Sequence, residues 1–316
     1  MQEWVEENES QRNSDCGFFI RYALEIGLHK YGAGVGEFIA PGTYFEPSLY
    51  ENPTVEDRQP ALIGRGGVYA GGRHFDYDQL RVSEDVSHSF YAGSRPLHPW
   101  EGETDPLDPI ASRAQGKYSW AKSPRYDVPD LGRRPLEAGP LARRVVASAP
   151  NPAGHQDSDP LFADMMATLG PSVFVRQMAR MHEAPKYFAW VMDWLGRIDL
   201  QGSFHTKPAE LESGKGWGAT EAARGALQDW IVIENGKIAN YQVVTPTAWN
   251  IGPRDSEGAA GPIEAALVGT PIRDMEDPVE LGHVARSFDS CLVCTVHAYD
   301  GKTGRQLTEF VVNGMV

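Results

Sequence analysis

The stretch "DWIVIENGKIANYQVV", from Asp229 to Val244, places two runs of β-prone residues on either side of Asn235-Gly236. An Asn-Gly pair favours positive φ at both central positions of a two-residue turn, so the sequence predicts a β-hairpin here. Earlier in the chain, "PLFADMMATLGPSVFVRQMARMHEAPKYFAWVMDWLGRI" has the apolar spacing of helices. Pro171 and Pro185 are expected to divide it into about three helices that pack on one another.

The remaining segments predict a mixture of helix, short strand and loop. "CGFFIRYALEIGLHKYG" has helical spacing and ends on Gly32, so we expect a helix over 16–32. Residues 40–158 are rich in Pro, Gly, Asp and aromatic residues, which indicates long loops, short strands and turns. "GPIEAALVG" predicts a short helix, and the stretch to Arg286 a partly helical one. The expected fold class is α+β, with a helical-bundle core, long irregular loops and the β-hairpin.

Composition restricts the class of protein. The 316 residues, 41% of them hydrophobic, are enough for one large domain or two ordinary ones. A net charge of −14 without a Lys/Arg-rich run argues against a nucleic-acid surface, which needs cations. No apolar stretch approaches the roughly 20 residues of a membrane span, and the acidic start does not read as a secretory signal. Three cysteines suit a reducing compartment and do not make a disulfide scaffold.

Two of the three cysteines lie close together in "SFDSCLVCTVHAYDG", where Cys291, Cys294 and His297 recur at a spacing of three. Two thiolates at this spacing can hold one soft metal ion, but a structural zinc site needs four ligands. There is no second C-x-x-C, since the third cysteine, Cys16, stands alone. No βαβ pattern surrounds the pair, as a thioredoxin-like redox motif would require. From spacing alone, a metal half-site, a redox pair and inert buried thiols all stay open.

The neighbouring segments narrow these alternatives. "RSFDSCLVCTVH" resembles D-P-C-x-x-C-x-x-H, the C-terminal signature of the large, catalytic subunit of nickel–iron hydrogenases. Further stretches resemble the same family in the same order: "EDVSHSFY", "HPWEGETDP", "KYSWAKSPRYD", "PLEAGPLAR", "GATEAARGALQDWIVIENGKIANYQVVTPTAWNIGPRD", "GPIEAALVGTPI" and "DPVEL". The resemblance begins at about residue 15, and the form of the last motif is similar to the oxygen-tolerant, actinobacterial-type branch.

The resemblance implies a reaction and its metals. The family interconverts dihydrogen with protons and electrons, H2 ⇌ 2H+ + 2e−, at a nickel–iron centre whose iron carries carbon monoxide and cyanide. By position, Cys291 would be a terminal nickel ligand that accepts a proton, and Cys294 a ligand bridging nickel and iron. His297 and the backbone carbonyl of Val243 would bind a Mg2+ or Fe2+ ion near the mature C-terminus.

Three further residues acquire roles from the resemblance, each beside a simpler alternative. Arg224 would overhang the open coordination site, hydrogen-bond a cyanide and polarise dihydrogen, where the alternative is a surface ion pair. Thr247 would donate to the other cyanide, where the alternative is a turn hydroxyl. Asp289 would orient Arg224 through a charge-assisted bond, and could also cap a helix before the cysteine pair. Structural roles in the interior are expected for His88, Trp120, Lys122, Arg125 and Tyr126.

The sequence departs from the family pattern in three places. The motif R-x-C-G-x-C, which supplies the other two thiolates, is absent, so residues 1–316 are expected to form a partial large-subunit domain that is inactive in isolation. The family's prolines are replaced by Ser290 and Ala223, and a frequent histidine by Asp229. Residues 298–316 continue past His297 and would be an extension removed on maturation.

Partners and location also follow from the resemblance. The expected partners are an iron–sulfur small subunit, a maturation chaperone, an endopeptidase and dihydrogen, in a hetero-oligomer that is cytoplasmic or peripherally membrane-associated. The alternative is a truncated, catalytically inactive relative that only docks on a small subunit or chaperone. A free-standing zinc or thiol-redox protein has only the C-x-x-C in its favour.

Overall fold

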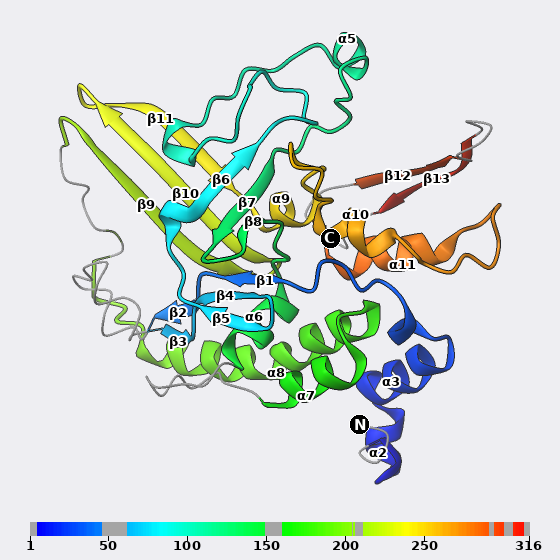
Figure 1. Ribbon diagram of the computed structural model, residues 1–316. Helices are drawn as coiled ribbons and strands as arrows, with labels where there is room; N and C mark the ends of the chain where they lie inside the picture. The colour runs from blue at the N-terminus through cyan, green and yellow to red at the C-terminus, as the bar shows by residue number, and fades with distance from the viewer. Residues whose placement is uncertain are drawn as a thin grey trace.

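The computed structural model describes residues 5–45, 62–148, 160–203, 205, 211–290, 294–299 and 306–312 (Figure 1). The helices are α2 (Glu9–Asn13), α3 (Asp15–Glu25), α5 (Pro109–Arg113), α6 (Pro140–Ala147), α7 (Pro160–Leu169), α8 (Val173–Arg197), α9 (Pro246–Ile251), α10 (Pro262–Leu267) and α11 (Val279–Ser287). Short 3-10 turns are η1 (Leu28–Lys30), η3 (Gln79–Arg81) and η4 (Pro99–Glu101). The strands are β1 (Phe38–Ala40), β2 (Thr43–Phe45), β3 (Leu62–Gly64), β4 (Gly67–Ala70), β5 (Arg73–Phe75), β6 (Val82–Asp85), β7 (Ser123–Val128), β8 (Gly132–Arg134), β9 (Gly214–Ala222), β10 (Gly225–Glu234), β11 (Lys237–Val244), β12 (Cys294–Tyr299) and β13 (Gln306–Val312).

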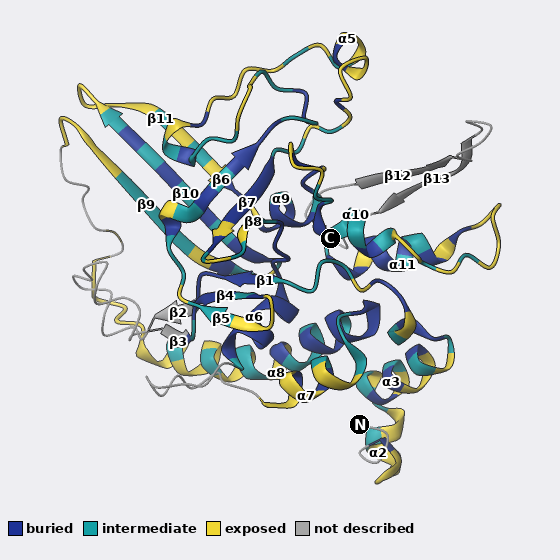
Figure 2. Cartoon of the chain, viewed as in Figure 1, coloured by how far each residue is buried: buried dark blue, intermediate teal, exposed yellow. Residues whose placement is uncertain are grey.

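The helices form one layer around a shared apolar cluster. Helices α3, α6, α7, α8 and α11 all contribute to it, and its fully buried members include Phe162 and Phe174. Figure 2 shows α7 and α8 lying along one side of the molecule, with exposed residues on their outer faces. The expected helical core is therefore confirmed.

A three-stranded antiparallel sheet in the order β11-β10-β9 forms the second layer. Its β10–β11 hairpin pairs Glu234 with Lys237, and Asn235 and Gly236 take φ values of 52° and 68°. The predicted hairpin and its turn are confirmed. Strand β10 alternates between buried and partly exposed residues, and its Trp230 joins Trp249 in a second apolar cluster. This second core was not predicted from the sequence.

The segment between the first helices and α7 holds short antiparallel strands, as expected. They form the sheets β1-β4-β5, β6-β7-β8 and β2-β3. Helix α6 was not predicted, and all eight of its residues are buried. Its apolar residues do recur at helical spacing, but eight residues are fewer than the roughly 11 to 18 over which a helical period is read. Pro140 at its first position follows Gly139, which has a φ of 139°.

Two helix boundaries differ from expectation. The first helix ends at Glu25, well before Gly32, and Gly27 takes a left-handed φ of 83°. Pro185 does not divide the next helices, because α8 runs through it without interruption. Pro185 lies on the exposed side of α8, where water can satisfy the carbonyl that loses its N–H partner. Only the break near Pro171, between α7 and α8, is confirmed.

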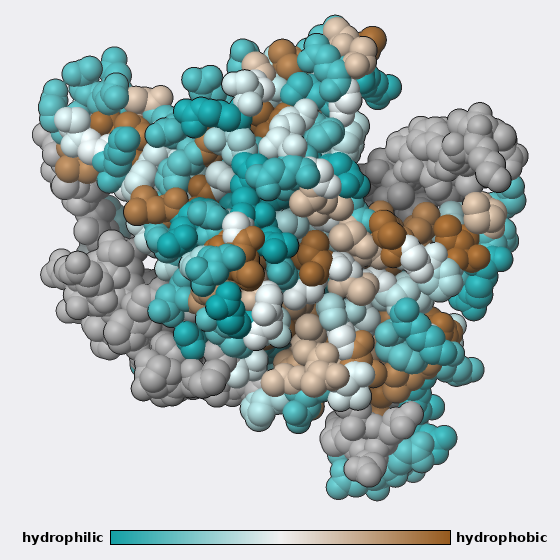
Figure 3. Space-filling model, viewed as in Figure 1, coloured by the Kyte–Doolittle hydropathy of each residue, from teal (hydrophilic) through white to brown (hydrophobic). Residues whose placement is uncertain are grey.

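Apolar side chains also reach the surface. Figure 3 shows them gathered beside α10 and α11 on the visible face, where Val268, Met275 and Val279 are exposed. None of the helices in the described part of the chain is long and apolar enough to cross a bilayer.

Candidate functional site

Arg224 lies on a tight turn between two strands. Ala222 pairs with Gly225, so Ala223 and Arg224 alone make the β9–β10 connection. Gly225 takes a φ of 121°, and a Cβ on it would lie 2.4 Å from the backbone nitrogen of Gly139. Only a residue without a Cβ permits two backbones to approach this closely. Gly225, the residue after Arg224, therefore packs directly against Gly139 at the start of α6.

Asp289 reaches Arg224 from the end of α11. The Nε of Arg224 lies 3.8 Å from Oδ2 of Asp289, and the two side chains are 32% and 33% exposed. The two groups form an ion pair, at a separation too long for the charge-assisted hydrogen bond that the family resemblance implied. Asp289 has a φ of 55° and its N–H donates to the carbonyl of Arg286, so it ends α11. A helix capped by Asp289 would begin at Ser290, which is not helical, and would continue into residues 291–293, outside the described residues.

Thr247 is the second residue of α9 and is 8% exposed. Helix α9 begins at Pro246, and the hydroxyl of Thr245 accepts from the N–H of Ala248 at 3.2 Å. The side-chain amide of Asn250 bonds both backbone groups of Ala138, at 2.9 and 3.0 Å. This pairing fixes α9 to the segment that precedes α6.

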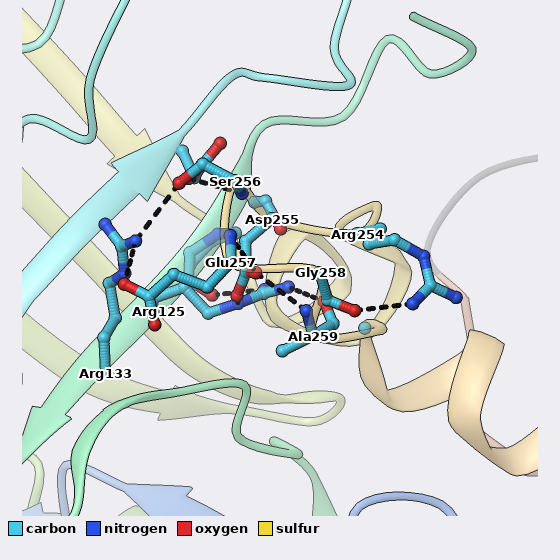
Figure 4. Close-up of polar contacts among 12 residues, drawn as sticks. Arg125, Arg133, Arg254, Asp255, Ser256, Glu257, Gly258 and Ala259 are labelled. Atoms are coloured by element: carbon cyan, nitrogen blue, oxygen red, sulfur yellow. Dashed lines mark hydrogen bonds and ion pairs between the residues drawn. The ribbon is translucent and has the colours of Figure 1, made fainter. Parts of the chain in front are cut away.

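The loop after α9 closes around a buried arginine (Figure 4). Arg125 donates from Nε to Oδ2 of Asp255 at 2.7 Å, and from Nη2 to the carbonyls of Pro253 and Ala259 at 3.1 and 3.0 Å. The other oxygen of Asp255 accepts from the N–H groups of Glu257 and Ala259. One guanidinium therefore holds the loop that follows α9.

The expected interior positions hold for some residues and fail for one. Arg125 and Tyr126 are fully buried, as predicted, and His88 is partly buried with Nδ1 2.7 Å from the carbonyl of Arg254. Trp120 is 53% exposed, so its predicted interior position is wrong. Its ring contacts Phe90 edge-on at the surface, with the centroids 5.2 Å apart.

Val243 lies on β11, opposite Asp229 on β10. Its neighbour Gln242 accepts from Nζ of Lys122 at 2.9 Å, and Lys122 also lies 3.4 Å from Glu84. Burial raises the pKa of Glu84, and the charge of Lys122 opposes that shift. Glu84 and Gln242 were not predicted as site residues. The available signals were the place of Glu84 at the start of "EDVSHSFY" and that of Gln242 next to Val243.

A buried charged cluster beside the Arg224 turn was also missed. Arg143 on α6 binds Glu183 through both carboxylate oxygens, at 2.8 and 2.6 Å, and Glu221 at 2.8 Å. The hydroxyl of Tyr187 donates to Glu183 at 3.0 Å. Burial raises the pKa of Glu221 to about 8, although the charge of Arg143 opposes the shift. The Oε1 atom of Glu221 is buried without a hydrogen-bond partner among the described residues.

The cysteine motif lies at the edge of the described chain. Cys294 and His297 belong to β12, which pairs with β13 in a register that matches Cys294 with Val312. Their side chains, and Cys291 entirely, lie outside the described residues. Across the part of the chain that is described, no group of three or more His, Cys, Asp or Glu is arranged to hold a metal. Cys16 is a partly buried free thiol in α3, and burial raises its pKa.

Comparison with known proteins identifies the family. The nickel-dependent hydrogenase family matches residues 20–297. The chain belongs to this family. It is 35% identical over 295 residues to the large subunit of the periplasmic [NiFeSe] hydrogenase of Desulfomicrobium baculatum, covering 90% of this chain and 53% of that protein. It is 33% identical to the hydrogenase-2 large chain of Escherichia coli, covering 84% of this chain and 46% of that one.

Solved hydrogenase structures share the fold. A reduced, active form of the Ni-Fe-Se hydrogenase of Desulfomicrobium baculatum superimposes with a TM-score of 0.70 at 33% identity, covering 86% of this chain and 54% of that chain. The reduced Ni-Fe-Se hydrogenase of Desulfovibrio vulgaris Hildenborough gives 0.70 at 28% identity, covering 92% and 57%. The mixed helix and sheet architecture is thus that of a hydrogenase large subunit. The chain spans about half the length of these relatives.

Proposed function

We propose that this chain is the C-terminal portion of a hydrogenase catalytic subunit that interconverts dihydrogen with two protons and two electrons, and passes the electrons to an iron–sulfur small subunit. The ion pair between Arg224 and Asp289 carries the proposal. It joins the β9–β10 turn to the segment two residues before Cys291. A fixed cation therefore lies next to the start of the cysteine motif.

Cys291 and Cys294 would hold the nickel–iron centre, as terminal and bridging thiolates. When bound, this centre supplies the polarisation of dihydrogen and the redox change, and its iron would carry carbon monoxide and cyanide. The residues fit such a group, because the Nε–H of Arg224 is buried without an acceptor among the described residues, and a cyanide nitrogen is an acceptor. The buried Thr247 would donate to the other cyanide. The Cys291 sulfur would take the proton.

A second metal site would use His297 and the carbonyl of Val243 to bind Mg2+ or Fe2+, with Lys122 and Glu84 nearby. Residues 298–316 would be removed by an endopeptidase after a chaperone has assisted metal insertion. Strand β13 lies within that extension. We assign the chain to the oxygen-tolerant branch on the form of its last motif, and place it in the cytoplasm or at a membrane through its partners.

The second candidate is a catalytically inactive relative that only docks on a small subunit or chaperone. This sequence has three cysteines and no R-x-C-G-x-C motif. A site with four thiolates would need two from another segment or polypeptide. The 316-residue chain alone is therefore expected to be inactive under either candidate.

The test is metal retention in the presence of the missing pair. The chain is co-expressed anaerobically with a small subunit, the maturation proteins and a polypeptide that carries R-x-C-G-x-C. Nickel content and infrared bands of metal-bound carbon monoxide and cyanide are then measured. We expect nickel and these bands in the wild type and in Cys16→Ala, the control for loss of a thiol elsewhere, and neither in Cys294→Ala. Wild-type protein without nickel or bands would favour the docking-only candidate, and normal nickel in Cys294→Ala would refute the ligand assignment.

A further inference from the structure

Helix α8 carries three charged residues along one stripe, and one of them, Arg180, contacts Asp289. Arg176, Arg180 and Glu183 follow the spacing i, i+4, i+7, which places them on the same face of a helix. Arg176 lies over the ring of Phe288, with its guanidinium carbon 3.9 Å from the ring centroid. Phe288 directly precedes Asp289, so the first residue of the stripe already supports the end of α11.

Arg180 holds the same segment more directly. Its Nη2 donates to the carbonyl of Ser287 at 3.0 Å, and its Nε lies 3.5 Å from Oδ2 of Asp289. Asp289 is thus shared between two arginines, and the contact with Arg180 is shorter than that with Arg224. The carboxylate that faces Arg224 is therefore fixed from α8.

Glu183 supports the turn that carries Arg224, and it does so through Arg143. The guanidinium of Arg143 offers five N–H groups, and each has an acceptor. Nε and Nη2 bind Glu183, Nη1 binds Glu221, and the remaining two contacts go to the carbonyls of Ala222 at 2.8 Å and Ala223 at 3.1 Å. These carbonyls belong to the two residues immediately before Arg224.

The Arg224 turn needs such support from outside. Favoured two-residue hairpin turns require positive φ at one or both loop residues. Neither Ala223 nor Arg224 has positive φ; the next residue, Gly225, takes a φ of 121° and packs against the backbone of Gly139. Local turn preference does not fix the orientation of Arg224, whereas the contacts with Arg143 and Gly139 do.

We infer that Arg143 on α6, anchored by Glu183 of α8, and Arg180 on α8 are positioning residues for the reaction. Together they hold Arg224 and Asp289 in register with each other. This inference rests on the proposed function for the role of the pair, but the positioning itself is a property of the described residues. Lysine at either position keeps the positive charge, but its ammonium group has only three N–H donors and lacks the planar arrangement of a guanidinium. A lysine at position 143 therefore cannot make the five contacts of Arg143.

Hydrogen exchange of the purified 316-residue chain, measured by mass spectrometry, tests the positioning. The variants are Arg143→Lys, Arg180→Lys and the matched control Arg125→Lys, since Arg125 is also a buried arginine that holds a carboxylate and loop carbonyls (Figure 4). We expect about tenfold faster exchange across 222–226 in Arg143→Lys and across 286–290 in Arg180→Lys. Arg125→Lys is expected to accelerate exchange across 253–259 and to leave 222–226 unchanged.

Equal exchange across 222–226 in Arg143→Lys and Arg125→Lys overturns the role of Arg143. Equal exchange across 286–290 in Arg180→Lys and Arg125→Lys overturns that of Arg180. If Arg143→Lys does not fold, Glu183→Gln is measured in the same way, because it weakens the anchor of Arg143 and leaves the donors of Arg143 in place. A smaller acceleration of exchange across 222–226 is then expected. The absence of any acceleration there would overturn the inference.

An activity measurement on the assembled enzyme separates this inference from the proposed function. We expect Arg143→Lys to lower kcat for dihydrogen oxidation about tenfold with little change in KM, because substrate binding does not use Arg143. A wild-type assembly without dihydrogen oxidation would contradict the proposed function and leave the exchange result to decide the positioning. An active wild type with unchanged local exchange in both variants would contradict the positioning alone.

Discussion

Glu221 illustrates how a single buried carboxyl can be tuned by its surroundings. One of its oxygens accepts from Arg143, and the other has no partner among the described residues. Arg143 is already bound through both oxygens of Glu183, so its charge is shared between two carboxylates. Burial therefore outweighs the attraction, and the pKa of Glu221 rises to about 8.

This raised pKa predicts a pH-dependent stability. Because the folded protein holds the proton of Glu221 more tightly than the unfolded chain does, the resulting stabilisation is complete below the unfolded pKa of about 4.3. It is lost as the pH rises toward about 8. In Glu221→Gln, the decline in the free energy of unfolding between pH 5 and 8 is expected to be shallower by up to about 1.4 kcal/mol per pH unit. Urea denaturation at several pH values measures it.

The control for this prediction is Glu234→Gln, which changes an exposed carboxylate at the end of β10. It is expected to leave the slope unchanged. A wild-type slope in Glu221→Gln would show that Glu221 stays ionised through this range.

At the residue scale, the sequence allowed only part of the site to be predicted. The resemblance to a family singled out Arg224 and Asp289, which the structure brings into contact. Arg143 and Arg180 were missed, because their significance depends on which backbone carbonyls they meet after folding. The i, i+4, i+7 spacing of Arg176, Arg180 and Glu183 was visible in the sequence. It was not a distinctive signal, because α8 carries further charged residues, Lys186, Asp193 and Arg197, on its exposed second half.

At the scale of elements, local chemistry decided which predictions succeeded. The β10–β11 hairpin was predictable because Asn235-Gly236 fixes its turn without help from distant residues. The short strands β1 to β8 could be expected only as a class, since their pairing joins segments far apart, such as Val82 with Tyr126. The division of α8 at Pro185 was predicted wrongly, because Pro185 lies on the exposed side of the helix, where water can replace the one backbone hydrogen bond that it removes.

The continuity of α8 makes a prediction about Pro185. The residue costs the helix one hydrogen bond on its exposed side and gains no buried contact there. Pro185→Ala is therefore expected to raise the free energy of unfolding by about 1–3 kcal/mol, as measured in urea. Pro171→Ala is the control, because Pro171 lies outside the helices, and there the loss of a rigid residue should slightly destabilise the protein. A destabilised Pro185→Ala would indicate that the proline has a role beyond the helix.

At the scale of the whole molecule, polar contacts join the two apolar cores. The helical cluster and the sheet cluster have separate members. Arg143 on α6 binds Glu183 on α8 and Glu221 on β9, so one guanidinium spans both layers. Unfolding of either layer while the other stays folded would leave a buried charge without a partner, which is costly. The two layers should therefore unfold together.

Native-state hydrogen exchange can test this cooperativity. Phe174 is fully buried in the helical cluster, and its truncation in Phe174→Ala should cost about 3–5 kcal/mol. If the layers form one unit, the most protected amides of β10, which lies in the other cluster, should exchange faster by the same factor as those of α8. Phe188→Ala on the same helix is the control, because Phe188 is 67% exposed. Its truncation should leave the exchange rates of both α8 and β10 unchanged. Faster exchange confined to α8 would mean that the sheet layer holds its structure independently, and that the arginine contacts between the layers contribute little to global stability.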